Sequence, residues 1–290
     1  MTVAVTVASA EPELSVIVPT RDRPGQLAAC LAALEAQTSA SFEVVVVDDG
    51  SLDAAAVAAV VGRVPPARLV HGVGRGPAAA RNLGAAAART SVLCFTDDDC
   101  RPGPGWLDTV ARRIHGGAAA VAGPTRNGQK ANVCSAASQT ITNHLVQASL
   151  DPSGATVRFA PTSNLACRAE VHRSLPFDEG YPLAAGEDRD WCARLRQTGA
   201  VIAFEPDAWV AHHQDLSLRG FWRQQVRYGR GAYRLHRGPG PRRAGLQRPR
   251  FYADLVREGV AGGVRTGLLV VLAQVATAVG ITREALAARR

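Results

Sequence analysis

The sequence contains almost no lysine: Lys130 is the only one among 290 residues, so arginine carries nearly all of the positive charge. The six cysteines are scattered, with no Cys-x-x-Cys pair, which argues against a zinc site and against a disulfide framework. The N-terminal stretch MTVAVTVASA lacks the positively charged region of a signal peptide. No segment of the chain repeats another. We therefore expect reduced thiols and a cytoplasmic location, with peripheral attachment to the inner face of the membrane as an open alternative.

Long apolar runs are also scarce, and the one at 266–282 lies in the arginine-rich C-terminal region. The formal charge of +8 is concentrated from residue 219 onward, where fifteen arginines face three acidic residues. Within this region the apolar run 266–282 lies between Arg265 and Arg283. It barely reaches the length needed to cross a bilayer, and it contains Gln274. We expect a docked helix or a membrane-surface element, and a true span remains the alternative.

The first hundred residues alternate between short apolar runs and helical patterns. The apolar runs predict buried strands at 14–19, 42–47, 68–73 and 92–96. Helical patterns lie between them, at 27–34, 54–61 and 78–89. This alternation predicts an α/β fold with a single Rossmann-like, mostly parallel sheet flanked by helices. Beyond residue 105 the alternation weakens, although helices are predicted at 133–150 and 188–197.

Polar clusters follow three of these strands, at 20–22, 48–49 and 97–99. Ligands bind outside the carboxyl ends of the strands in such sheets, so the three clusters predict a site. Three consecutive aspartates at 97–99 repel one another and are costly to bury. A bound Mg²⁺ or Mn²⁺ would stabilise them and leave positions open for phosphate oxygens. An Asx turn or a helix cap before Pro102 is the open alternative.

Several motifs, taken in order, resemble family 2 glycosyltransferases of the GT-A fold. The motifs are SVIVPTRDRPGQLAACLAALEAQT from residue 15, VVVVDDGS from 44, GPAAARNLGAAAA from 76, FTDDD from 95, PTSNLACR from 161 and GEDRDWCARL from 186. The resemblance covers residues 14–228. It implies an inverting enzyme that moves a sugar from a nucleotide-diphosphate sugar to an acceptor hydroxyl, assisted by Mg²⁺ or Mn²⁺.

The resemblance also implies roles for individual residues. The nucleotide sugar would contact Pro19, Thr20, Arg21, Asp49, Arg81, Asp97 and Asp98. The metal would be held by Asp99 and Asp97, the two carboxylates of the DxD motif. His212 follows a strand-like segment, as the late histidine ligand does in some GT-A enzymes; a histidine at the surface or core edge is the equal alternative.

Transfer with inversion needs one general base to take the proton of the acceptor hydroxyl. The family places this base in its Glu-Asp pair, which implies Asp188 as the base and Glu187 as the second choice. Contacts to the acceptor or the diphosphate are expected from Asn164, Trp191 and Arg227. Gln224 and Arg227 faintly resemble the QxxRW signature of processive synthases, but the several membrane spans of those enzymes are absent here.

We expect three regions: a flexible leader at 1–13, a GT-A domain at 14–230 and a basic, apolar helical extension at 231–290. Within the domain, 14–105 would bind the nucleotide and 106–230 the acceptor, which the sequence leaves open between a glycan, a lipid-linked molecule and a secondary metabolite. The basic extension fits anionic lipid head groups or a phosphorylated acceptor, and a solvated face is the alternative. No nucleic-acid module accompanies it, so no nucleic-acid partner is expected.

Two other functions were weighed against this one. A nucleotidyltransferase would carry a glycine-rich phosphate loop after the first strand, and the turn PTRDRPG is too poor in glycine. A non-catalytic nucleotide-sugar binding module on the same fold would be expected to lose the metal-binding or basic carboxylates, and both are present. The glycosyltransferase therefore remains the preferred hypothesis.

Overall fold

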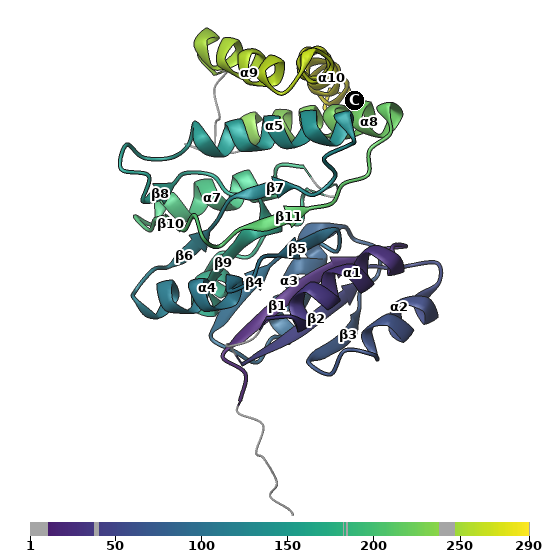
Figure 1. The fold of residues 1–290 in the computed structure, drawn as a ribbon, viewed down its shortest axis with the longest axis vertical. Coiled ribbons are helices and arrows are strands. Elements are labelled where there is room, and N and C mark those ends of the chain that lie inside the picture. Colours follow the sequence, from purple (N-terminus) through teal and green to yellow (C-terminus); the bar gives the residue numbers. More distant parts are fainter. Residues whose placement is uncertain (1–10, 38–40, 182, 184, 238–246, 290) are drawn as a thin grey trace, which may run out of the picture.

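A sheet of eight strands lies at the centre of the computed structural model (Figure 1), which describes residues 11–37, 41–181, 183, 185–237 and 247–289. In chain order these strands are β1 (Leu14–Thr20), β2 (Phe42–Asp48), β3 (Ala67–His71), β4 (Val92–Phe95), β6 (Ala120–Ala122), β8 (Thr156–Val157), β9 (Leu165–Arg168) and β10 (Ile202–Phe204). Their order across the sheet is β3-β2-β1-β4-β9-β6-β10-β8.

The strands of the N-terminal half pair in parallel, as the sequence predicts. β1 lies between β2 and β4, and β3 continues the sheet beyond β2. In the second half β9 runs antiparallel to both β4 and β6, whereas β10 pairs in parallel with β6. Because β1, β2 and β4 run in one direction, their carboxyl ends meet at one edge, where the polar clusters of the sequence lie.

Two groups of helices cover the two faces of the sheet. α1 (Pro24–Glu35), α2 (Ala54–Val61) and α4 (Trp106–His115) pack on one face. α3 (Pro77–Ala87), α6 (Ala169–Ser174) and α7 (Glu187–Gln197) pack on the other. Because neighbouring residues of a strand point to opposite faces and both faces are covered, the central strands need unbroken apolar runs such as that of β2.

A second, three-stranded sheet adds a feature that the sequence analysis did not resolve. It consists of β5 (Cys100–Pro102), β7 (Thr125–Asn127) and β11 (Val210–His212), in the order β5-β11-β7, and the 3-10 helix η1 (Thr162–Asn164) precedes β9. Strands this short carry no readable alternation of apolar and polar residues. The antiparallel pairing of β5 with β11 places Cys100 opposite His212, and so brings the histidine beside the acidic triplet.

The remaining four helices form a layer beyond the small sheet, at the upper end of Figure 1. They are α5 (Val133–Gln147), α8 (Leu218–Arg237), α9 (Pro249–Ala261) and α10 (Val264–Ala287). α8 runs unbroken across residues 230 and 231, where the sequence predicts a boundary between the domain and the extension. The division of the chain into these regions remains a prediction. Residues 1–10 of the predicted leader and residues 238–246 of the predicted C-terminal extension lie outside the described residues.

α10 docks on the other helices of this layer, and α8 and α10 approach closely at glycines. Val270 and Ala273 of α10 are fully buried in a small apolar core shared with α5, α8 and α9. A Cβ atom on Gly280 would lie 2.0 Å from the carbonyl oxygen of Val226 in α8. Among the described helices, α10 alone has the length and hydropathy to cross a membrane, and 33% of its most apolar stretch is buried.

We predict that Gly280→Ala lowers the free energy of unfolding by about 1–3 kcal/mol, because the added methyl group overpacks the contact between α8 and α10. In an open helix the same change would stabilise. Gly25→Ala is the matched control, since a Cβ atom on Gly25 in α1 meets nothing within 4 Å. Urea unfolding of both variants measures the difference. Equal unfolding midpoints for the two variants would contradict the close contact between α8 and α10.

Candidate active site

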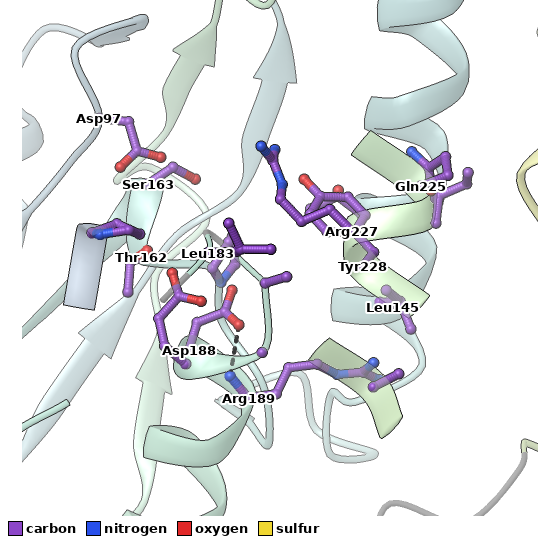
Figure 2. Close-up of a pocket in the computed structure, with 18 of the residues that line it drawn as sticks. Asp97, Leu145, Thr162, Ser163, Leu183, Asp188, Arg189, Gln225, Arg227 and Tyr228 are labelled. Carbon is purple, nitrogen blue, oxygen red and sulfur yellow. Dashed lines mark hydrogen bonds between the residues drawn. The ribbon is translucent and has the colours of Figure 1, made fainter. Parts of the chain in front are cut away.

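A cavity of about 550 Å³ lies at the carboxyl ends of β1, β2 and β4 and extends to the C-terminal helices. Most residues that the sequence predicts for the site line this cavity, although they come from distant segments. They are Pro19, Thr20, Arg21, Asp49, Arg81, Asp97, Asp99, Glu187, Asp188, His212 and Arg227. Figure 2 shows Asp97, Asp188 and Arg227 around this space. Their contacts with substrates remain predictions.

Asp49 lines the cavity after β2 and fixes the loop that precedes α3. Its carboxylate accepts hydrogen bonds from the backbone N–H groups of Gly74, Arg75 and Gly76, at 3.0, 3.1 and 2.8 Å. Gly74 and Gly76 have φ angles of 76° and 96°, which only glycine adopts readily. Because a carboxylate can accept about four hydrogen bonds, the predicted contact of Asp49 with a nucleotide base is compatible with this arrangement.

Positive side chains relieve the repulsion within the acidic triplet. Arg81 Nη2 lies 2.7 Å from Asp97 Oδ1. Asp99 pairs with His212 Nε2 at 3.2 Å and with Arg23 Nη1 at 3.3 Å. The arginines and the histidine reach the triplet from three separate parts of the chain.

The middle carboxylate, Asp98, corrects our expectation. It was expected to contact ribose or sugar hydroxyls, but it is fully buried and absent from the cavity wall. Its oxygens accept a hydrogen bond from Thr20 Oγ1 at 2.7 Å and pair with Arg23 at 2.7 Å. Consecutive side chains at the end of the strand point in different directions. The middle side chain, Asp98, therefore points into the protein and holds the turn after β1.

Asp98 and Asp99 differ in how readily they hold a negative charge. Burial alone would raise the pKa of Asp99, but the charges of His212 and Arg23 outweigh it and hold the pKa at about 2. Burial raises the pKa of Asp98 to about 7, although Arg23 opposes the change. Burial would lower the pKa of His212, yet Asp99 outweighs this and raises it. Asp99 is therefore held ionised at the cavity wall.

These groups form a candidate metal centre. Ligand atoms of Asp97, Asp99, Cys100 and His212 all lie within 4.8 Å of one another. Burial raises the pKa of the Cys100 thiol well above its usual value, which disfavours the thiolate that binds metals. Two carboxylates and an imidazole remain, and this set suits Mn²⁺ or Mg²⁺. The residues present therefore fit the ion that the sequence predicts.

Arg81 connects this centre to α7. The buried guanidinium donates to Asp97 at 2.7 Å and to Glu187 Oε1 at 3.0 Å. It thereby joins α3 to the segment after β4 and to α7. Burial raises the pKa of Glu187, although Arg81 opposes the rise. No pattern in the sequence indicates this bridge, because the partners are far apart along the chain.

Asp188 lies beside Glu187 at the start of α7 and faces the cavity (Figure 2). Its Oδ1 accepts a hydrogen bond from the backbone N–H of Arg189 at 2.7 Å. Burial, followed by repulsion from Glu187, raises the pKa of Asp188 to about 7. No residue of the described ranges hydrogen-bonds to its other oxygen, Oδ2, so that oxygen can take a proton. The pKa is suited to a general base at neutral pH.

Two predicted contact residues lie in the core instead of the cavity wall. Asn164 accepts from Trp106 Nε1 at 2.9 Å and donates to the carbonyl oxygens of Pro124 and Ala208 at 3.1 and 2.8 Å. Trp191 is fully buried and donates from Nε1 to the carbonyl oxygen of Leu175 at 2.7 Å. Neither side chain lines the cavity, so the geometry does not favour these two predicted contacts.

Much of the cavity wall consists of residues that no sequence motif indicates. Arg23 was not singled out, although it lies in the quoted turn after β1 and touches two carboxylates. The far part of the cavity is lined by side chains of α5, α8, α9 and α10, including Leu145, His236, Phe251 and Tyr252. These helices carry no local motif that marks them, because only their packing brings them to the site.

Comparison with known proteins gives a consistent answer. A model of the family described as glycosyl transferase family 2 matches residues 15–172. The pre-mycofactocin glycosyltransferase of Mycobacterium tuberculosis (strain ATCC 25618 / H37Rv) is 29% identical over 230 residues, which are 76% of this chain and 47% of that protein. Glycosyltransferase AglE of Haloferax volcanii is 28% identical over 230 residues, covering 76% and 73% of the two chains. The chain thus spans about half the length of the mycobacterial relative.

Solved structures share the fold. The mannosyltransferase PcManGT from Pyrobaculum calidifontis, in complex with GDP-Man and Mn²⁺, superposes with a TM-score of 0.62 at 20% identity, covering 96% of this chain and 80% of that one. S. aureus TarS 1-349 in complex with UDP gives a TM-score of 0.55 at 17% identity, covering 84% and 70%.

Proposed function

Because the chain belongs to glycosyl transferase family 2 and has the GT-A fold that its motifs predicted, we propose that it transfers a sugar from a nucleotide-diphosphate sugar to an acceptor hydroxyl, with inversion. One observation carries this proposal: the same cavity is lined by the candidate metal centre around Asp99 and by Asp188, whose pKa is raised. A leaving diphosphate and an attacking hydroxyl need these two kinds of group.

A divalent ion would be held by Asp97, Asp99 and His212. When bound, it supplies the positive charge that stabilises the departing diphosphate. The Mn²⁺ in the PcManGT complex supports this part of the proposal by analogy. Cys100 takes no part, since its thiol is protonated.

The protein's own side chains supply the rest of the chemistry. Arg23 and Thr20 hold the first turn against Asp98, so Arg21 at the cavity wall is placed beside the donor. Arg81 keeps Asp97 in place and neutralises part of the acidic charge. Asp188 accepts the proton of the acceptor hydroxyl at Oδ2 as the new glycosidic bond forms. No second nucleophile is invoked, so the sugar is displaced in one step and its configuration inverts.

We predict that Asp188→Asn lowers kcat by about 10²–10⁴-fold and leaves the donor Kd near the wild-type value, because a base acts on the chemical step alone. The folded-state pKa of Asp188 is raised to about 7, so the wild-type kcat should rise as the pH increases through 7 and the carboxylate ionises. Initial rates and calorimetric donor titrations measure both effects.

Asp207→Asn is the matched control, since Asp207 is exposed and lies outside the cavity wall. It should keep wild-type kcat and its pH dependence. If Asp188→Asn also keeps full turnover, the base is a different residue.

We also propose that α10 rests on an anionic membrane surface at the cytoplasmic face. Val264, Leu268, Val271 and Val275 recur at helical spacing and are 47–71% exposed, so they form one apolar stripe. Arg265 lies in the first turn of the same helix, within the region of the chain that carries the excess of arginines. Exposed apolar side chains beside arginines fit the head-group layer of an anionic bilayer.

The double variant Leu268→Glu with Val275→Glu should reduce co-sedimentation with vesicles of phosphatidylglycerol by at least about tenfold, because it places two carboxylates in the stripe. Leu52→Glu is the control, since Leu52 is 95% exposed but lies far from α10, after β2. Wild-type protein should bind neutral phosphatidylcholine vesicles much less. Equal binding of wild-type and doubly substituted protein would contradict the proposed contact.

A further inference from the structure

The part of the cavity beyond Asp188 has a mixed apolar and cationic wall. Leu145 of α5, Phe159 and the α9 residues Phe251 and Leu255 give it an apolar surface. Arg189 of α7 enters the same space: in Figure 2 its side chain extends away from Asp97, toward Leu145. Arg189 is therefore turned away from the acidic cluster, where the diphosphate of the donor is expected.

Within the described part of the chain, no ion pair neutralises the Arg189 side chain. It makes no ion pair within 4.0 Å to any residue of the described ranges, and its guanidinium lies 5.5 Å from the centre of the Phe159 ring. Arg194 on the same helix shows the usual arrangement, because it pairs with Asp190 at 2.7 Å. Burial lowers the pKa of Arg189, with Asp188 as the one carboxylate in the described part of the chain that opposes it.

A second basic group lies near the first. Burial, and then the charge of Arg189, lowers the pKa of His236 of α8, and no carboxylate of the described residues acts on that imidazole. Tyr252 of α9 also interacts electrostatically with Arg189 and lines the same wall. Arg189 and His236 both line this part of the cavity, and no ion pair within the described part of the chain balances the guanidinium. An anion bound there would stabilise that charge.

We propose that Arg189, with His236 and Tyr252, binds an anionic group of the acceptor, while the wall of Leu145, Phe159, Phe251 and Leu255 binds its hydrocarbon part. The acceptor is then an anionic amphiphile, a carboxylate or a phosphate, whose hydroxyl lies at Asp188. This assignment rests on the proposed function, since it names the acceptor class of that same site.

The test measures binding of three matched probes, octyl phosphate, octanoate and octan-1-ol, to the full chain by calorimetry. The wild-type protein should bind at least one anionic probe at least about tenfold more tightly than octan-1-ol. Arg189→Gln should weaken binding of that anion by about 10–100-fold, which is the range for truncating one partner of a charge-assisted contact. Arg189→Lys should restore part of the loss. The tighter anion tells carboxylate from phosphate.

Arg196→Gln is the matched control, because Arg196 is exposed on the same helix and lies outside the cavity wall. It should bind the probes as the wild type does. The titrations are repeated with saturating Mn²⁺ and UDP or GDP, which should leave probe binding intact. Loss of the anionic probe on nucleotide addition would show that it had occupied the donor's phosphate position, and would overturn the proposal.

Equal affinity of wild-type and Arg189→Gln protein for both anions would overturn it as well, and so would octan-1-ol binding as tightly as they do. The proposed function is tested separately, by consumption of nucleotide sugars. Absence of that consumption, together with Arg189-dependent binding of an anion, would contradict the enzyme and leave the anion site standing.

Discussion

The site depends on keeping negative charge at a buried rim of the sheet. Carboxylates that follow a core strand would take up protons or destabilise the fold if nothing balanced them. Arg23, Arg81 and His212 supply that balance, each from a different part of the chain, so the rim forms only when the first turn, α3 and β11 are all in place. The fold and the electrostatics of the cavity are therefore linked.

The same surroundings give Asp99 and Asp188 different charge states near neutral pH. Asp99 is held ionised by His212 and Arg23, whereas Asp188 is shifted toward neutral pH by burial and by Glu187. One group is thus suited to a cation and the other to a proton. Arg81 donates hydrogen bonds to both Asp97 and Glu187, which fixes the distance between the acidic cluster and the start of α7. α10 adds to this, because it lines the cavity with Gln274 and Ile281 and carries its apolar stripe on the solvent side.

Local patterns made the N-terminal half predictable. The runs at 14–19 and 42–47 are buried on both faces, and the aspartates after them mark the ligand edge without any knowledge of packing. Side-chain direction was not predictable to the same extent. Asp98 turns inward although its two neighbours face the cavity, and Trp191 belongs to the core because α7 packs its apolar face on the sheet. The bridge from Arg81 to Glu187 and the wall built by α8, α9 and α10 depend on contacts between distant segments, for which one sequence carries no signal.

The central claim is that the acidic cluster binds a divalent cation at the donor's diphosphate. Crystals grown with Mn²⁺ and a nucleoside diphosphate, measured at the manganese absorption edge, test it most directly. We expect an anomalous peak bonded to Asp99 and close to Asp97 and His212, with the ion in contact with the diphosphate. A peak elsewhere in the cavity, or a nucleotide bound with the Asp99–His212 pair intact and no ion beside it, would contradict the account.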